Sequence, residues 1–470
     1  MRFVSRANER AIELSEAHNA RTAPLCATTT RGRIRAWGVK SAMSLTDQGL
    51  TSAAGFGVNI LLARWMIANL YGAFALAFAG YLFLTGFHNV LLLEPLSVIG
   101  PARHADNLKN YFHAQIAVHG VLVLPLAALA LLLAVILWRV TPGSPLSGAL
   151  AGAGAALPFL LFLWLTRRMC YVLLRPALAV WGSGFYFVAA VIALIGLRYF
   201  HQVTPFNAFL SMGFASLLGA ILIMRRIGLR SLDVVGGSTI SRRKVLLENW
   251  IYGRWLVGSA ILYALSTYSQ MFFVAGILGL SAAGILRAMQ IPSLAMTQVI
   301  TAIGLLVLPS FSFDFGRGRS ASLRHKSMIV SAAAGLAAAG FAVLLLIART
   351  PIEHLVFGGR YAQYAWLIPV LALVPLLNGA TMGCSMVLRA FQRPYFDFVS
   401  NVCAAPVAVV SSIFFTRWWG IAGAAESLVV SFAIFSVVTT IFFRRLLREQ
   451  ALVSAEGTQT ADQSGLVEFE

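Results

Sequence analysis

The chain has 470 residues, of which 59% are apolar and only 11% are charged, and its mean hydropathy is +0.79. A soluble protein carries about 25% charged residues, so this composition excludes a water-soluble fold of this size. The net charge of +19 raises the question of a nucleic-acid partner. The basic residues are scattered over many segments rather than gathered in one patch, which argues against nucleic acid. The composition therefore predicts a polytopic membrane protein.

The apolar residues fall into runs that are long enough to cross a bilayer as helices. A hydrocarbon core about 30 Å thick requires about 20 residues of helix. The runs are continuously apolar rather than alternating, which favours an all-α protein over a membrane β-barrel. Twelve spans are predicted, at residues 43–63, 72–94, 112–138, 148–166, 178–197, 205–224, 255–275, 282–309, 327–348, 366–388, 398–416 and 421–443.

The basic residues set the expected orientation, because Lys and Arg are retained on the cytoplasmic side of a membrane protein. If the N-terminus lies inside, most of the 36 basic residues fall on cytoplasmic segments. The few outside are Arg64, Arg139, Arg198, Arg349, Arg360 and Arg417. The first 40 residues hold no apolar run followed by a cleavage site, so we expect a cytoplasmic tail and no secretory signal. Both termini are predicted to be cytoplasmic.

The two halves of the chain share weak matches at nearly constant spacing. Tyr71-Gly72 matches Ala283-Gly284, Glu94-Pro95 matches Leu308-Pro309, and Arg175-Pro176 matches Arg393-Pro394. Together they predict a duplication, with two six-helix lobes in the same orientation around a central cavity. The expected organisation is a cytoplasmic N-terminal tail at 1–40, an N-lobe at 41–224, a cytoplasmic linker at 225–254, a C-lobe at 255–445 and a disordered cytoplasmic tail at 446–470.

Features that would indicate an enzyme are missing from the sequence. There is no Gly-rich phosphate-binding loop. The longest predicted external segment, from Arg349 to about Ala365, offers only Glu353 and His354. His113 and His119 are six residues apart, which is the wrong spacing for zinc on one helical face. The sequence therefore predicts a protein that is not an enzyme and has no cofactor or metal.

One cation lies well inside a predicted span. An ionisable group near the bilayer centre costs roughly 2.5 to 3.5 kcal/mol, so such a group is a functional candidate. Arg287 follows the start of the 282–309 span by five residues and could attract a phosphate in a water-filled cavity. The alternative is a side chain that extends to the external interface. Arg64, at the outer end of the first span, has the same two interpretations.

Several other polar groups lie near the ends of spans or within them. Asp47 and Glu94 could carry a coupling proton or pair with a basic neighbour such as Arg254, although plain interfacial residues are also expected near helix ends. Asn59 and Asn378 could line the cavity, and interhelical hydrogen bonds would explain them equally well.

These residues belong to segments that resemble a known family. Residues 47–49, 59–64 and 71–75 resemble the opening of Wzx-type polysaccharide flippases of the multidrug/oligosaccharidyl-lipid/polysaccharide exporter superfamily. Residues 254–257 and 282–288 look like the start of that family's second half. Leu388-Arg389-Ala390 with Arg393-Pro394 is similar to its connection between the tenth and eleventh helices. The resemblance extends over about residues 41 to 445.

The resemblance implies a V-shaped cavity that opens alternately to the two sides of a bacterial inner membrane. The implied cargo is an undecaprenyl-diphosphate-linked oligosaccharide, with Arg287 holding the diphosphate and Arg64 and Arg254 assisting at the two mouths. The implied partners are the lipid-linked glycan, membrane lipid and a polysaccharide polymerase. The peptidoglycan-precursor branch has more helices and more cavity arginines, so an exopolysaccharide or O-antigen repeat unit is favoured.

Other functions remain open at this point. A cation-coupled multidrug exporter belongs to the same superfamily. A twelve-helix facilitator of another fold is disfavoured, because residues 100–106 lack the Gly-x-x-x-Asp and paired-basic pattern of that group. A membrane glycan polymerase or ligase would be expected to carry Arg-rich external loops, and the external segments of this chain are short.

Overall fold

The computed structural model describes residues 30–229, 240–316, 320–390 and 395–465. Most of the predicted N-terminal tail, the middle of the predicted linker and the last five residues lie outside the described residues. The described chain is helical throughout, apart from short turns. The predicted all-α membrane fold is confirmed.

The first half of the chain forms the helices α2 to α8. Three of them begin at a proline, at Pro145, Pro176 and Pro205. Proline suits a first turn because its φ is already helical and its missing N–H would have no partner there. The elements are α2 (Thr30–Trp65), α3 (Ala68–His88), the π-helix η1 (Asn89–Leu93), α4 (Glu94–Arg103), η2 (Ala105–Asn107), α5 (Leu108–Val140), α6 (Pro145–Val172), α7 (Pro176–Tyr199) and α8 (Pro205–Ile227).

The second half contains longer helices and, between α11 and α14, a stretch of short ones. Its elements are α9 (Arg242–Leu278), α10 (Leu280–Gly316), α11 (Ser320–Ile347), α12 (Arg349–Phe357), η4 (Ala362–Tyr364), α13 (Leu367–Leu371), α14 (Leu373–Ala390) and α15 (Tyr395–Gly465). Gly420 has a φ of 61° and a ψ of −136°, which turns the chain inside α15. A positive φ favours glycine because it has no Cβ. The turn separates the predicted spans 398–416 and 421–443.

The predicted spans lie in helices, apart from the end residues Ala348 and Trp366 and the turn residue Ala372 between α13 and α14. Among the described residues, nine helical segments are long and apolar enough to cross a membrane. The segment from Phe398 to Arg448 contains two predicted spans, and α2 and α10, which are not among the nine, hold two more. Helix also continues through 446–465, where the composition predicts a disordered tail, and α9 begins inside the predicted linker.

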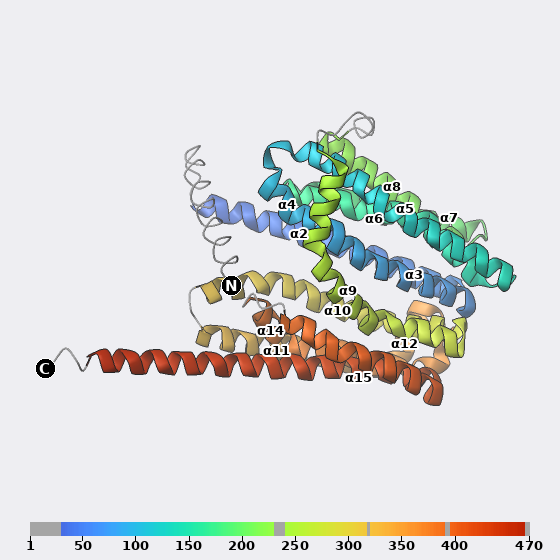
Figure 1. Cartoon of the computed structure of the whole chain (residues 1–470). Coiled ribbons are helices and arrows are strands. Elements are labelled where there is room, and N and C mark those ends of the chain that lie inside the picture. The colour runs from blue at the N-terminus through green and yellow to red at the C-terminus, as the bar shows by residue number, and fades with distance from the viewer. Residues whose placement is uncertain (1–29, 230–239, 317–319, 391–394, 466–470) are drawn as a thin grey trace.

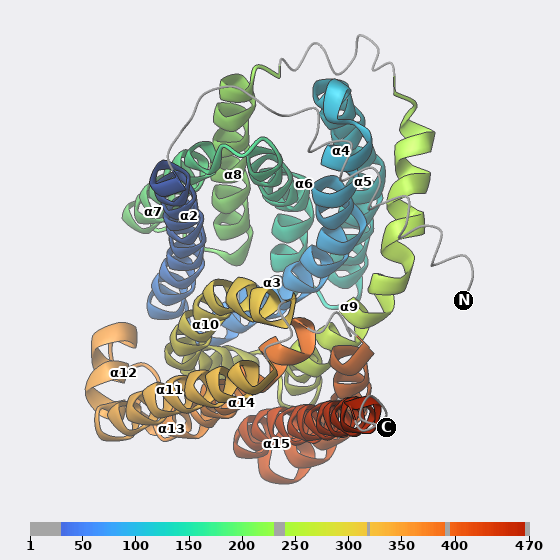
Figure 2. The same cartoon turned by 90° about the vertical axis from the view of Figure 1, so that its left-hand side faces the viewer.

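The helices form two packed groups (Figures 1 and 2). We call α2 to α8 the N-terminal helix group and α10 to α15 the C-terminal helix group. α2 begins, α8 ends and α9 begins at one end of the molecule, which we call the basic end because the exposed residues Arg225, Arg226 and Arg242 lie there. The opposite end, where α2 ends and α12 lies, is called the α12 end.

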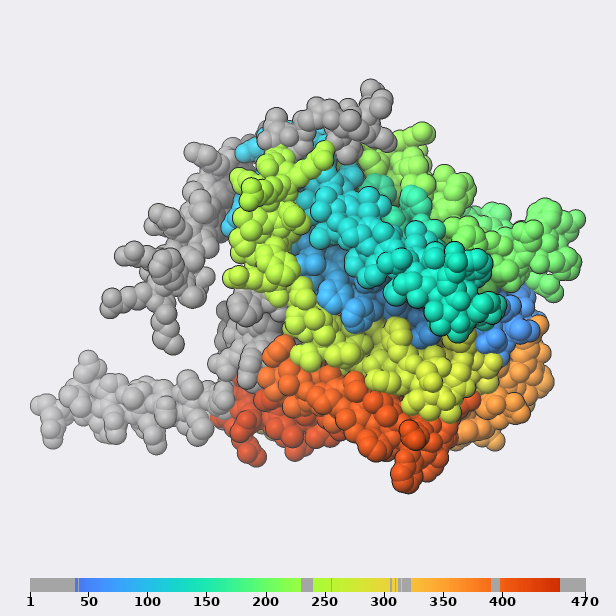
Figure 3. All heavy atoms as spheres, turned by 45° about the vertical axis from the view of Figure 1, so that its right-hand side comes forward, coloured from blue at the N-terminus to red at the C-terminus, as the bar shows by residue number. Residues whose placement is uncertain are grey.

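α9 connects the two groups along their length. In its first half, Asn249 and Gln115 of α5 exchange two hydrogen bonds of 3.0 and 3.1 Å, and both side chains are buried. In its second half, Gln270 donates to the carbonyl of Ala424 in α15. Figure 3 shows the yellow-green atoms of α9 running from the cyan and teal helices to the orange atoms of α15. One helix is therefore fastened to both groups.

The two groups meet most closely where α3 crosses α10. A Cβ on Gly72 would lie 1.7 Å from the carbonyl oxygen of Leu280, and a Cβ on Gly284 would lie 2.3 Å from that of Ala68. Only glycine permits such an approach of two helix backbones, and small residues have this role in many membrane proteins. The weak sequence repeat pairs Gly72 with Gly284, so the two matched glycines contact each other.

A methyl group at this crossing should push the two groups apart. We expect Gly72→Ala to lower the melting temperature of the purified protein by several degrees, because overpacking costs about 1 to 3 kcal/mol. Gly80→Ala is the matched control, since Gly80 lies on the same helix and its added Cβ meets nothing within 4 Å. Equal melting temperatures for the two variants would contradict the close crossing.

Candidate functional site

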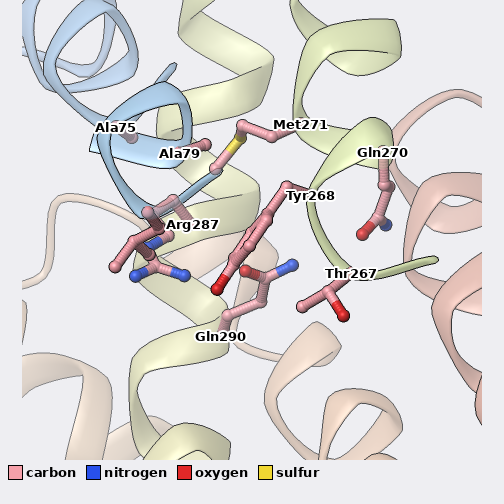
Figure 4. A pocket seen from close by; sticks show the side chains of 9 residues that line it. Ala75, Ala79, Thr267, Tyr268, Gln270, Met271, Arg287 and Gln290 are labelled. Atoms are coloured by element: carbon pink, nitrogen blue, oxygen red, sulfur yellow. The ribbon is translucent and has the colours of Figure 1, made fainter. Parts of the chain in front are cut away.

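Arg287 lies in a small pocket between the two helix groups (Figure 4). The pocket is formed by one helix of the N-terminal group, α3, together with α9 and α10. The hydroxyl of Tyr268 points towards the guanidinium, and the amide group of Gln290 lies beside the tyrosine ring (Figure 4). The cavity volume of 20 Å³ has room for about one water molecule in this conformation. The lining residues are Ala75, Ala79, Leu82, Thr267, Tyr268, Gln270, Met271, Arg287 and Gln290.

The pocket carries a positive charge that no carboxylate balances among its lining residues. Arg287 is half-buried, and its Nε atom is fully buried with no hydrogen-bond partner in the described structure. Its guanidinium carbon lies 6.0 Å from the centre of the Phe78 ring, which offers a weak cation–π contact. A buried cation without a counterion is costly, so the pocket is suited to an anion.

The other proposed cargo-binding residues lie elsewhere. Asn59 is buried between α2 and α3, where it donates to the carbonyl of Gly55 and accepts from Tyr71. Arg254 is exposed on the first half of α9. Asn378 is half-buried on α14. None of the three is among the residues that line the Arg287 pocket.

Arg64 takes part in a closure at the α12 end. It donates to the carbonyl of Leu355 at 3.1 Å. Arg360 donates to the carbonyl of Met66 at 2.8 Å, and the hydroxyl of Tyr361 donates to that of Ala63 at 3.2 Å. These three bonds join the last turn of α2 to the segment that begins at α12. They hold the two helix groups together on the far side of the Arg287 pocket from the basic end.

Tyr361 is the buried member of this closure. Burial is the main reason why its pKa is raised to about 12, with the neighbouring carboxylate of Glu353 adding to the effect against the influence of Arg360. The hydroxyl therefore stays protonated at neutral pH and remains a donor. Glu353, which is fully buried, accepts from the backbone N–H of Tyr361 at 2.8 Å and so fixes the turn that presents the tyrosine.

Asp47 is the centre of a buried polar cluster in the N-terminal helix group. Arg167 of α6 binds both carboxylate oxygens, from Nε at 3.2 Å and from Nη2 at 2.7 Å. The hydroxyls of Tyr171 and Ser183 donate to the same carboxylate. Both charged residues are almost fully buried. The bidentate geometry gives directional as well as electrostatic stabilisation.

Glu94 belongs to a second, more open cluster. Its Oε1 accepts from the side chain of Asn89 at 3.0 Å, and the oxygen of Asn89 accepts from Arg168 at 3.2 Å. Arg167 and Arg168 are consecutive, so one turn of α6 serves both acids. The structure brings Arg167 of α6 to Asp47, and it brings Arg168 of α6 close to Glu94 through Asn89.

Sequence reasoning missed Arg167 because the predicted span 148–166 stops just before it. α6 in fact continues to Val172, which carries Arg167 into the protein interior, where it is 5% exposed. The signal was available in the spacing, since Arg167 and Tyr171 are four residues apart and therefore share one helical face. Ser183 gave no signal, because it reaches Asp47 only through the packing of α7 against α2.

A double-mutant cycle tests the Asp47–Arg167 pair. Arg167→Gln leaves a buried carboxylate without its cation and should lower the free energy of unfolding by about 3 to 5 kcal/mol. Asp47→Asn combined with Arg167→Gln should recover a substantial part of that loss, because no uncompensated charge remains. Thermal unfolding of the purified variants provides the measurement, with the exposed Arg226→Gln as control. Losses that simply add would show that the pair is not coupled.

Comparison with known proteins relates this chain to others by fold alone. No protein-family model matches the chain. No curated protein sequence matches it either.

Solved structures of membrane transporters do match. An inward-facing multidrug resistance MATE family transporter of the MOP superfamily has a TM-score of 0.74 and 13% identity, over 88% of this chain and 99% of that one. The lipid II flippase MurJ in an inward closed conformation has a TM-score of 0.62 and 12% identity, over 88% and 90%. A MOP superfamily transporter from Pyrococcus furiosus, described as having a binding pocket of reversed polarity, has a TM-score of 0.60 and 14% identity, over 88% and 96%.

At these identities the likeness concerns the course of the backbone. The helix arrangement around the Arg287 pocket is therefore one that transporters with different cargoes share. This chain is a multi-pass membrane protein with the fold of the MATE and MurJ transporters.

Proposed function

We propose that this protein moves an undecaprenyl-diphosphate-linked oligosaccharide across a bacterial inner membrane by alternating access. The observation that carries the proposal is Arg287, a half-buried cation between the two helix groups whose buried Nε has no hydrogen-bond partner among the described residues. A diphosphate supplies the missing anion. Guanidinium groups bind phosphate oxygens through pairs of hydrogen bonds, which makes arginine well suited to this task.

The remaining lining of the pocket fits a sugar better than a drug. Gln290, Gln270 and Thr267 provide amide and hydroxyl groups that can exchange hydrogen bonds with sugar hydroxyls. Tyr268 provides a flat face together with a hydroxyl. A lipophilic cation would meet the positive charge of Arg287 without a compensating carboxylate in the lining. The electrostatics therefore favour an anionic headgroup.

The proposal also assigns sides and moving parts. The basic end faces the cytoplasm, because retained Lys and Arg mark that side. The N-lobe of residues 41–224 and the C-lobe of residues 255–445 then rock against each other. In the present conformation the glycine crossing and the Arg64, Arg360 and Tyr361 bonds close the external side. Cargo enters from the cytoplasm, the lipid tail remains in the bilayer, and a polymerase takes up the glycan outside.

Asp47 is the candidate for energy coupling. Its carboxylate is held by Arg167, so a proton on Asp47 would release the arginine and change how α2, α6 and α7 pack. Glu94 is a second candidate in a more open position. A carboxylate that exchanges a cation partner for a proton provides the differential interaction that alternating access requires.

Substitution of Arg287 tests the anion-binding role. In a strain that lacks the native gene, Arg287→Gln should reduce surface polysaccharide about tenfold or more, because a hydrogen bond to a charged group contributes about 1.5 to 3 kcal/mol. Lipid-linked repeat units should accumulate at the same time. Arg287→Lys should recover part of the export, since the charge is kept and the paired geometry is lost. Polysaccharide and protein levels are measured together.

The matched control is Arg198→Gln, which removes an exposed arginine from the last turn of α7. It should leave export unchanged. Normal export by Arg287→Gln at a normal protein level would show that Arg287 does not bind the cargo.

A cation-coupled multidrug exporter is the second candidate. The observation in its favour is the match to the MATE transporter over 99% of that protein's length. Expression in a host whose own drug pumps are deleted separates the two functions. Raised resistance to lipophilic cations, with unchanged surface polysaccharide in the deletion strain, would replace the flippase proposal with this one.

A further inference from the structure

Two buried histidines on α3 and α5 form a hydrogen-bonded pair that the proposed transport function does not use. The Nε2 atom of His88 lies 3.1 Å from Nδ1 of His119. The Nε2 atom of His119 lies 3.2 Å from the carbonyl oxygen of Pro158 on α6. His88 is 4% exposed and His119 is 6% exposed. One chain of hydrogen bonds therefore joins three helices.

The carbonyl at the end of this chain assigns the protons on both rings. A carbonyl oxygen can only accept, so the proton of His119 is on Nε2. A neutral His119 then presents a bare Nδ1, and His88 donates to it from Nε2. The Nδ1 atom of His88 is left as an unprotonated nitrogen, and it is buried without a hydrogen-bond partner in the described structure.

This bare nitrogen can take up one proton without breaking either hydrogen bond. The new N–H would have no acceptor here, and a buried charge without a partner is unfavourable. A conformation that admits water to this nitrogen therefore binds the proton more tightly. Because a ligand shifts an equilibrium towards the state that binds it better, protons favour the hydrated conformation.

His88 lies at the junction of α3 with a second helical segment, so a movement of its ring can shift that segment. It is the last residue of α3, and the π-helix η1 begins at the next residue. π-helical turns are rare and are frequently found at functional sites. The carbonyl of Val90 in η1 faces Gly253 of α9, where an added Cβ would lie only 2.8 Å from the oxygen. η1 thus packs directly on the helix that is fastened to both groups.

The charged groups of the surrounding elements lie around this pair rather than on it. Arg168 of α6 contacts Asn89, the residue after His88, and Asn89 contacts Glu94. His119 is the titratable residue that bonds to the His88 ring. Helices that pack on α3 and η1 carry further charged and titratable side chains, which include Arg167 and Arg168 on α6, Glu94 on α4, Tyr252 on α9 and Arg287 on α10, and the helices of the pair themselves carry Tyr81 on α3 and His113 on α5.

From this geometry we infer that His88 and His119 form a proton-binding site, separate from Asp47, whose occupation loosens η1 from the first half of α9. The ligand is the proton itself. The site responds to pH whether or not the cargo is a lipid-linked glycan, so the inference can be tested without any cargo.

Hydrogen exchange measured by mass spectrometry on the full chain in lipid nanodiscs provides the test. The wild type is compared at about pH 7.5 and about pH 5.5, a range in which a hydrated histidine changes its charge, with rates corrected for the intrinsic pH dependence of exchange. Peptides covering η1 and the start of α9 should exchange up to about tenfold faster at the lower pH, because protons favour the hydrated conformation. An unchanged wild type would overturn the inference without any variant.

Two substitutions locate the response. His88→Gln keeps an N–H donor near the position of Nε2 but cannot bind the proton, so it should abolish the pH response. His113→Gln, which removes a buried histidine of α5 outside the pair, should keep the response. A response that survives His88→Gln, or that is lost in His113→Gln, would assign proton binding to another group and overturn the inference.

Discussion

An apolar medium allows an ionisable side chain two ways to keep its charge, which are pairing and hydration. Arg167 and Asp47 follow the first, with two hydrogen bonds between them inside the N-terminal helix group. Arg287 has neither a carboxylate partner among the residues that line its pocket nor a bulk-water cavity in this conformation. In the part of the chain that the structure describes, the buried Arg167 thus has its carboxylate partner, whereas the half-buried Arg287 has a buried Nε without one. Arg287 marks the place where an anionic ligand gains most.

The proposed movement of two lobes depends on the contacts between the helix groups. The largest apolar core runs through both groups. The groups are further joined by the glycine crossing of α3 on α10, by the bonds from Arg64, Arg360 and Tyr361 to backbone carbonyls, and by the bridging helix α9. Bonds to backbone carbonyls can be exchanged for water at little cost. Gly72 and Gly284 have no side chains that a movement would have to separate.

Much of the fold followed from the sequence, because crossing a bilayer requires only an apolar run of sufficient length along the chain. A span needs about 20 apolar residues, and the twelve predicted spans lie in helices for that reason. Boundaries were less well predicted, since a helix does not stop where hydrophobicity stops. α6 carries Arg167 inside, α9 begins thirteen residues before its predicted span, and α15 continues through residues for which disorder is predicted.

The sequence by itself determined the class of protein, the positions of the spans and the unusual character of Arg287, since each depends on local composition. Only the tertiary structure decided which groups meet. It assigned Arg167 to Asp47, joined His88 to His119 and bonded Arg64 to the carbonyl of Leu355 in the closure at the α12 end. The physical reason is that partners on different helices share no fixed spacing along the chain. Their contact depends on how whole helices rotate and pack, which no short stretch of sequence records.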